Sequence, residues 1–403
     1  MRILQLINRV PWPLKDGGSI GYYNFIKGYH DAGCSVDVAA LNTSKHYVNM
    51  QAIPPDLSAI ADWHTVNIDN RVKVVDAFLN LFSTKSYHVE RFISTEFEGM
   101  LTQLLQAKQF DVVIFESLFT TPYINVVRNN SKALLVLRHH NVEHEIWESL
   151  ALQTRNPVKK WYVSLLAKRL KKFEFKQLNV VDISTCVTQQ DAETFRGMGC
   201  TIPIHVIPAS VDNHLLEIPL QKIETPSLFH IGSMEWEPNV HAMRWFIDEV
   251  WKQLSVQFPS LQFHIAGRGM SDAFKQLTAP NLVIEGEVED AVLFMRSKQI
   301  MVVPLFSGSG IRVKILEGMA LGKAIVATSL GAQGIACEHN KNILIANTAD
   351  EFCQCIGQLL NNPVLCETLG KEARKLVVEK YSNTKIAADV LTFYRQQSKH
   401  KGV

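Results

Sequence analysis

Residues 302–328 read VVPLFSGSGIRVKILEGMALGKAIVAT, and the order of residue types in this stretch indicates the fold class. An apolar run leads into a Gly-Ser-Gly turn. Apolar residues at helical spacing, a glycine stop and a second apolar run follow. A strand, a helix and another strand in succession are typical of a parallel sheet that is covered by helices. The stretch therefore predicts one repeat of an α/β domain.

The same alternation extends along the whole chain. Short apolar runs predict strands in the first half at 2–8, 34–41, 112–115, 133–138 and 182–187, and in the second half at 227–231, 261–266, 282–284, 300–304 and 324–327. A polar stretch with Pro219 and Pro226 lies between the two sets and is typical of a linker. We expect an α/β protein of two Rossmann-like, doubly wound domains that face a central cleft. The expected domains are 1–212 and 213–380, and a C-terminal helix in 381–403 is expected to return to the first domain.

Length and composition support a two-domain globular protein. The 403 residues exceed the ~250–300 at which a single core stops growing. Apolar residues make up 47% and charged residues 20%, with a formal net charge of +2, which excludes a disordered or nucleic-acid-coating chain. The seven cysteines lack the paired spacings of zinc sites and suit a reducing compartment. No apolar run approaches the ~20 residues of a membrane span. We expect a cytoplasmic protein, with at most surface contact to the inner face of the membrane.

The glycine turn of the opening stretch has the features of an anion site. The turn Gly308-Ser309-Gly310 presents backbone N–H groups at the start of a helix, which carries partial positive charge. Arg312 and Lys314 add cations where the helix dipole already disfavours them, and this makes sense if an anion binds there. Glu317 can accept hydrogen bonds from the paired hydroxyls of a ribose. The alternative is ordinary surface charge on a helix.

A second glycine turn lies near the start of the chain. Gly17 and Gly18 follow the first predicted strand and precede a predicted helix with Tyr22, so they also suit an anion. The alternative is a plain tight turn, because glycine permits positive φ without any ligand. The spacing matches neither a Walker loop nor a dinucleotide fingerprint, which argues against a P-loop protein or a dehydrogenase.

Histidines cluster at the end of the predicted strand 133–138. This strand runs into Arg138-His139-His140-Asn141-Val142-Glu143-His144-Glu145, at an edge where open α/β sheets bind ligands. The cluster could hydrogen-bond a sugar hydroxyl, act as a general base or ligate a metal. A solvated loop that happens to contain histidines is a further alternative. We favour the site that faces a sugar.

Taken in their order, these segments make the chain similar to the family-four glycosyltransferases, the glycosyl transferases group 1, which have the GT-B superfold. The resemblance spans nearly the whole length and includes Gly17-Gly18, 137–143, 232–234, 266–269 and the helix of Glu317. In that family a glycine loop approaches the donor phosphates, a histidine meets the donor sugar and a glutamate binds the ribose. The resemblance places these roles on Gly17 and Gly18, on His140 and on Glu317. It makes His140 and Glu317 the candidate catalytic residues.

The resemblance also suggests further donor-binding residues, and it has departures. Gly232 belongs to the loop after the first strand of the second domain, Arg268 is a neighbour of the base or phosphates, and Val288 lies in a segment that lines the base. The first glutamate of the Glu-x7-Glu element is replaced by Ser309, so the donor-sugar contact is altered. The loop at Gly232 lacks the usual arginine and lysine, and we infer that Arg312 and Lys314 supply the charge. The remaining predicted donor contacts are Gly308, Gly310 and Glu317.

The expected function is transfer of a hexose-type sugar from a nucleoside diphosphate sugar in glycan or cell-envelope polysaccharide synthesis, with retention implied by the resemblance. The acceptor is an unidentified carbohydrate, lipid-linked molecule or protein, and no nucleic acid partner is expected. No metal or other cofactor is expected, because cations and helix dipoles can neutralise the leaving diphosphate. The alternatives are a non-hydrolysing nucleotide-sugar epimerase and a catalytically silent sugar-nucleotide-binding subunit.

A basic helix is predicted across 159–173, with lysines and an arginine opposite an apolar face. Such a helix could make peripheral contact with anionic lipid. The alternative is a domain helix with a solvated lysine face.

Overall fold

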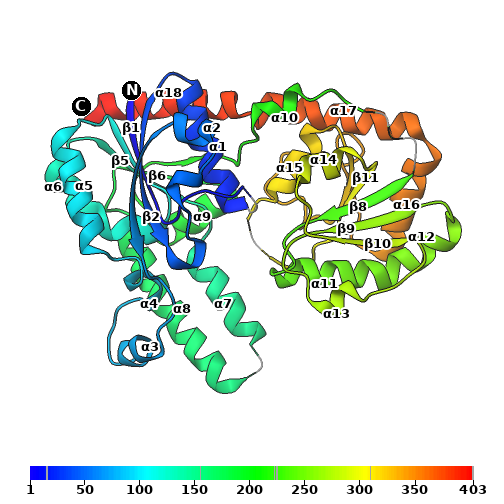
Figure 1. Cartoon of the computed structure of the whole chain (residues 1–403), viewed down its shortest axis with the longest axis horizontal. Coiled ribbons are helices and arrows are strands. Elements are labelled where there is room, and N and C mark those ends of the chain that lie inside the picture. The colour runs from blue at the N-terminus through cyan, green and yellow to red at the C-terminus, as the bar shows by residue number, and fades with distance from the viewer. Residues whose placement is uncertain (15–16, 155, 222, 224–225, 309, 402–403) are drawn as a thin grey trace. The chain divides into compact units, whose positions relative to one another are not determined.

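The computed structural model describes residues 1–14, 17–154, 156–221, 223, 226–308 and 310–401. The chain divides into two compact units, Met1–Pro208 with Ile386–Val403, and Ala209–Lys385 (Figure 1). The first unit ends at Pro208, four residues before the predicted domain boundary at 212. The reason is long-range pairing, since Val211 forms a β-bridge with Ser382 and is thereby part of the second unit.

The first unit contains a seven-stranded parallel sheet in the order β3-β2-β1-β4-β5-β6-β7. The order reverses direction at β1, as in doubly wound folds. The five predicted strands are present, and the sheet has two more, β3 and β7. The histidines therefore follow the fifth strand and not the fourth. The strands are β1 (Arg2–Ile7), β2 (Ser35–Thr43), β3 (Asp62–Ile68), β4 (Val112–Phe115), β5 (Leu134–His139), β6 (Ile183–Cys186) and β7 (Ile204–Val206).

Helices cover both faces of this sheet (Figure 1), and apolar side chains fill a core on each face. The first helix, α1, begins at Gly17, so both glycines lie in its first turn and not in a loop before it. Helices α7 and α8 lie side by side as a hairpin. The α-helices before the second unit are α1 (Gly17–Asp31), α2 (Pro55–Ala59), α3 (Val74–Asn80), α4 (Tyr87–Glu90), α5 (Thr95–Ala107), α6 (Ile124–Asn130), α7 (Glu143–Gln153), α8 (Pro157–Gln177) and α9 (Gln189–Gly197).

The second unit contains a six-stranded parallel sheet in the order β10-β9-β8-β11-β12-β13. Its core is one cluster that includes the fully buried Trp251 and Phe263. The five predicted strands are present, and the two-residue β13 was not predicted. The strands are β8 (Ser227–Ile231), β9 (Gln262–Ala266), β10 (Leu282–Gly286), β11 (Ile300–Val303), β12 (Ala324–Ala327) and β13 (Leu344–Ile345). The helices are α10 (Asn213–Glu217), α11 (Glu237–Trp245), the π-helix η4 (Phe246–Trp251), α12 (Lys252–Gln257), α13 (Asp272–Lys275), α14 (Ala291–Arg296), α15 (Val313–Ala320), α16 (Ala349–Asn361) and α17 (Pro363–Lys380).

The last helix, α18 (Asn383–Lys401), connects the second unit back to the first. Its apolar side chains Ile386, Val390, Leu391 and Tyr394 are buried in the core of the first unit. The predicted fold class is therefore confirmed in its two Rossmann-like units and its returning helix. Among the helices in the described part of the chain, none is long and apolar enough to cross a membrane.

Candidate functional site

A buried carboxylate, Glu116, organises the polar cluster of the first unit. It directly follows β4 and is fully buried. Gln5 Nε2 donates to its Oε1 at 2.6 Å, and Arg138 Nη1 and His140 Nε2 approach its Oε2 at 3.2 and 3.1 Å. These partners come from β1, from β5 and from the residue after β5, so adjacent parallel strands bring them together.

The electrostatics of this cluster keep Glu116 ionised. Burial would raise its pKa, but Arg138 and the hydrogen bond from His140 outweigh burial and hold the pKa below its ordinary value. The Arg138 guanidinium also lies 3.3 Å from the centre of the Phe25 ring. A buried ion pair of this kind is costly to break, because either partner would be left as an uncompensated charge.

His140 is the partly accessible member of the cluster, with 21% of its side chain exposed. The Tyr22 ring packs edge-on against it at 5.1 Å, and the Tyr22 hydroxyl donates to Asn8 Oδ1 at 2.7 Å. Burial lowers the pKa of His140 more than Glu116 raises it, so the imidazole is neutral near pH 7. Because an ionised carboxylate only accepts, Nε2 carries the proton and Nδ1 carries the lone pair. Tyr22 belongs to α1, so the helix that begins at Gly17 also supports His140.

The three clustered histidines contact three different partners. His139 Nε2 lies 3.2 Å from Ser184 Oγ, its ring packs against Phe195, and burial lowers its pKa to about 4. His144 Nδ1 lies 2.6 Å from Glu174 Oε2. The histidines therefore do not converge as metal ligands. Within the described ranges, no group of three or more His, Cys, Asp or Glu side chains could hold a metal ion. The expectation that no metal or cofactor takes part stays a prediction.

Glu174 of α8 holds the start of α7. Its oxygens accept from the backbone N–H groups of Glu143 at 3.0 Å and His144 at 3.2 Å, which is a side-chain cap supplied from another helix. Burial, followed by the nearby Glu174 charge, raises the pKa of Glu143 to about 8. Glu143 is thus a carboxyl group that keeps its proton near neutral pH.

This raised pKa predicts how Glu143→Gln changes stability with pH. In the unfolded chain the Glu143 carboxyl group loses its proton near its ordinary pKa, whereas the folded protein keeps the proton up to about pH 8. Rising pH in this window therefore destabilises the wild-type fold through Glu143, and an amide does not titrate. We expect the melting temperature of Glu143→Gln, relative to wild type, to increase from pH 5 to pH 8. Glu145→Gln changes an exposed neighbour on α7 and is the control, so the difference between its melting temperature and that of wild type should stay constant over this pH range. A constant difference for Glu143→Gln as well would contradict the raised pKa of Glu143.

In the second unit, glycines let the loops after several strands come into close contact. A Cβ on Gly267 would lie 1.8 Å from the carbonyl oxygen of Gly232, so the loops after β8 and β9 meet at a point where no side chain fits. Gly308 has φ +107°, and its Cβ would lie 2.4 Å from the Trp236 ring. The glycine turn after β11 therefore packs against the loop after β8, at the edge of the sheet where ligands bind.

Arg312 is the N-cap residue of α15 and lies beside these loops. Its guanidinium donates to the Gly310 carbonyl and lies 5.3 Å from the centre of the Trp236 ring. Burial lowers the pKa of Arg312 to about 10, which still leaves it cationic near pH 7. A partly desolvated cation at a helix start is well placed for an anion. Ser309, which replaces the first glutamate of the family element, lies outside the described residues.

Lys314 and Glu317 form an ion pair, with Lys314 Nζ 2.7 Å from Glu317 Oε2. Glu317 is buried and lies one turn into α15. Arg268 Nη2 lies 3.7 Å from Glu235 Oε2 in the loop after β8. Val288, two residues beyond β10, is half-buried against the core. Those predicted donor contacts of this unit that the structure describes thus lie on loops after β8 to β11 and on α15.

Sequence reasoning missed two residues that organise these clusters. Glu116 had a readable signal, because a charged residue directly after the apolar run 112–115 stands at a strand end. Trp236 had no such signal. Its contacts with Gly308 and Arg312 join loops that are about 70 residues apart, as is ordinary for long-range packing in doubly wound sheets.

Residues 225–362 match the model of the family described as glycosyl transferases group 1. Two relatives are similar in sequence. An "Uncharacterized 44.6 kDa protein in cps region" of Klebsiella pneumoniae is 22% identical over 301 residues, which cover 72% of this chain and 76% of that protein. An uncharacterized glycosyltransferase of Methanocaldococcus jannaschii is 31% identical over 112 residues, which cover 27% of this chain and 31% of that protein.

Three solved structures show the same fold. TarM of S. aureus superposes with a TM-score of 0.71 at 14% identity, covering 98% of each chain. Sucrose-phosphate synthase from Thermosynechococcus elongatus superposes with a TM-score of 0.67 at 16% identity, covering 98% of this chain and 99% of that chain. HepE of Anabaena, solved in complex with UDP, superposes with a TM-score of 0.66 at 12% identity, covering 98% of this chain and 100% of that chain. The fold is thus shared along nearly the whole chain.

Proposed function

We propose that this chain, which matches the glycosyl transferases group 1 in residues 225–362 and shares its fold with TarM, is a glycosyltransferase that transfers a hexose-type sugar from a nucleoside diphosphate sugar to an acceptor, with retention of anomeric configuration. The proposed context is the synthesis of a glycan or cell-envelope polysaccharide. The acceptor is a carbohydrate, a lipid-linked molecule or a protein. The proposal places the enzyme in the cytoplasm.

The observation that carries this proposal is the arrangement of glycines and cations at the start of α15. Gly308 and Gly310 adopt positive φ, and Arg312 and Lys314 place two cations at a helix end that is already electropositive. A diphosphate satisfies all of these groups at once. The anion that HepE holds is UDP, which makes uridine diphosphate sugars the first donors to test.

The other predicted contacts complete the proposed donor site. Glu317 accepts from the ribose hydroxyls, and Lys314 then lies between this carboxylate and the diphosphate. Val288 lines the base, while Gly232 and Arg268 contribute through the loops after β8 and β9. The resemblance assigns phosphate contacts to Gly17 and Gly18 as well, and Ser309 takes the place of a sugar-binding glutamate. His140 contacts the donor sugar.

The proposed chemistry uses the groups of the chain itself. As the bond between the anomeric carbon and the diphosphate lengthens, negative charge grows on the leaving phosphate. The N–H groups at the start of α15, together with Arg312 and Lys314, stabilise that charge without a metal ion. The neutral imidazole of His140, held by Glu116, presents its Nδ1 lone pair to a sugar hydroxyl and favours positive charge at the anomeric carbon.

A screen of nucleotide sugars tests the proposed function. The full-length protein is incubated with each donor alone, while binding is followed by thermal shift and nucleoside diphosphate release by a coupled assay. We expect one donor to bind and to release nucleoside diphosphate slowly by transfer to water. A new sugar nucleotide in place of free diphosphate would identify the epimerase. Binding without release, even with candidate acceptors, would identify the silent subunit.

A further inference from the structure

A short segment of the first unit exposes apolar side chains to an unusual degree. It consists of residues 72–82 and contains the seven-residue helix α3. None of the residues of α3 is buried, and six large apolar side chains of the segment are more than half exposed: Val72, Val74, Val75, Phe78, Leu79 and Phe82. Contiguous exposed apolar surface of this kind marks an interaction site.

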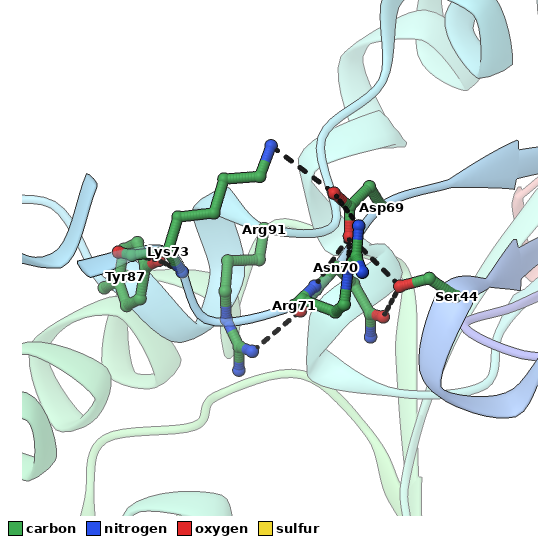
Figure 2. A network of polar contacts seen from close by, with 7 residues as sticks. All are labelled: Ser44, Asp69, Asn70, Arg71, Lys73, Tyr87 and Arg91. Atoms are coloured by element: carbon green, nitrogen blue, oxygen red, sulfur yellow. Dashed lines mark hydrogen bonds and ion pairs between the residues drawn. The ribbon is translucent and has the colours of Figure 1, made fainter. Parts of the chain in front are cut away.

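The N-terminal end of the segment is held by a polar network (Figure 2). Asp69 accepts from Arg71 Nε at 2.8 Å and pairs with Lys73 Nζ at 3.5 Å. The Tyr87 hydroxyl accepts from the backbone N–H of Lys73 at 3.0 Å and donates to its carbonyl at 3.2 Å. Arg91 Nη1 donates to the Asn70 carbonyl at 2.9 Å. The chain entering α3 is therefore fixed from both sides.

The C-terminal end of the segment is held by α8. Arg169 Nη1 donates to both the carbonyl and the side-chain oxygen of Asn80 at 2.8 Å, and its Nη2 donates to the Leu81 carbonyl at 3.0 Å. These bonds satisfy carbonyl groups at the end of α3. With both ends anchored in this way, the fold presents the apolar side chains of α3 to solvent in a defined position.

Cations surround this apolar segment. Arg71 precedes it, Lys73 lies within it together with the acidic Asp76, and Lys85 follows it. A hollow next to it is lined by Lys85, Arg169, Lys172 and Lys176 together with the acidic Glu90. Along α8 there are seven Lys and Arg residues and a single acidic residue, Glu174, whose carboxylate caps α7. The surface therefore combines exposed apolar groups with an excess of positive charge.

We propose that residues 72–82 and the basic face of α8 form a docking surface for an anionic lipid bilayer. Val74, Val75, Phe78 and Phe82 enter the boundary between headgroups and acyl chains, while the surrounding lysines and arginines contact lipid phosphates. Charge decides the choice of occupant. A second copy would bring its own ring of cations against this one, whereas an anionic membrane complements both the apolar and the charged groups. This surface is independent of the donor site.

Vesicle flotation tests the proposal with the full-length protein. One set of vesicles is phosphatidylcholine alone, and the other contains equal parts of phosphatidylcholine and phosphatidylglycerol. We expect wild type to float with the anionic vesicles only. The double variant Phe78→Glu/Phe82→Glu should lower the bound fraction about tenfold, because charged groups replace the inserted rings. Val256→Glu on α12 is the matched control, since Val256 and Phe82 are both 80% exposed, and it should bind as wild type does.

A second variant separates the contribution of the cations from that of the apolar side chains. Lys172→Ala/Lys176→Ala should weaken binding to anionic vesicles and reduce its dependence on salt, because two phosphate contacts are lost. The Phe78→Glu/Phe82→Glu and Val256→Glu variants change only exposed apolar side chains, so their melting temperatures should stay near that of wild type. Absence of wild-type binding to anionic vesicles, or equal binding by the Phe78→Glu/Phe82→Glu variant, would overturn the proposal. A wild-type dimer that this variant converts to a monomer would assign the surface to a second copy.

Discussion

His140→Ala is expected to lower kcat for glycosyl transfer by ~10²-fold or more, an effect of general acid–base or electrostatic scale. The reason is that the buried Glu116 lies 3.1 Å from Nε2 of a neutral imidazole, which leaves the Nδ1 lone pair for the proposed contact with a sugar hydroxyl. Affinity for nucleoside diphosphate should stay near wild type, since the proposed phosphate contacts lie on other residues. Steady-state kinetics with the identified donor and calorimetry with nucleoside diphosphate measure the two effects.

His139→Ala is the matched control for this prediction. His139 contacts Ser184 and Phe195 and is buried, so its removal should lower the melting temperature while most of kcat survives. If His140→Ala keeps most of its turnover, or loses turnover only by unfolding, then His140 is structural. Loss of kcat in a folded His139→Ala variant would make His139 the sugar contact instead.

Arg312→Ala and Lys314→Ala are each expected to weaken nucleoside diphosphate binding by about 1.5–3 kcal/mol, or roughly 10- to 150-fold in Kd. Each change removes a proposed charge-assisted contact to phosphate at the start of α15. The donor sugar should not alter the size of the effect, because the lost contacts are to the diphosphate. Calorimetry with nucleoside diphosphate and with the intact donor measures both affinities.

Two further variants, Lys252→Ala and Glu317→Ala, serve as comparisons for the phosphate contacts. Lys252→Ala removes an exposed cation from α12 of the same unit and should leave affinity unchanged. Glu317→Ala should weaken nucleotide binding in part, through the lost ribose contacts. Lys314→Ala leaves the buried Glu317 without its 2.7 Å partner, so its melting temperature is measured alongside affinity. Unchanged affinity in both Arg312→Ala and Lys314→Ala would place the phosphate site elsewhere, with Gly17 and Gly18 as the leading candidates.

The order of strands and helices could be predicted from the sequence, and the reason is local. Strands that are buried on both faces of a parallel sheet are continuous apolar runs, so 112–115, 227–231 and 324–327 were predicted to the residue. The edge strand β3 was missed because its sequence, DWHTVNI, is polar and mostly not buried. The glycine turn before α15 could also be predicted, since its composition reports a local backbone requirement.

The partners of each residue were decided only by the tertiary structure. Gln5 and Glu116 are 111 residues apart, and nothing near either of them in sequence indicates that they share a hydrogen bond. Val74–Asn80 reads VVDAFLN, which in isolation is typical of a core helix, yet the fold leaves it exposed between polar contacts from Tyr87 and Arg169. Local composition specifies the backbone conformation of a segment, whereas burial and ion pairing depend on which distant segments the sheet order brings beside it.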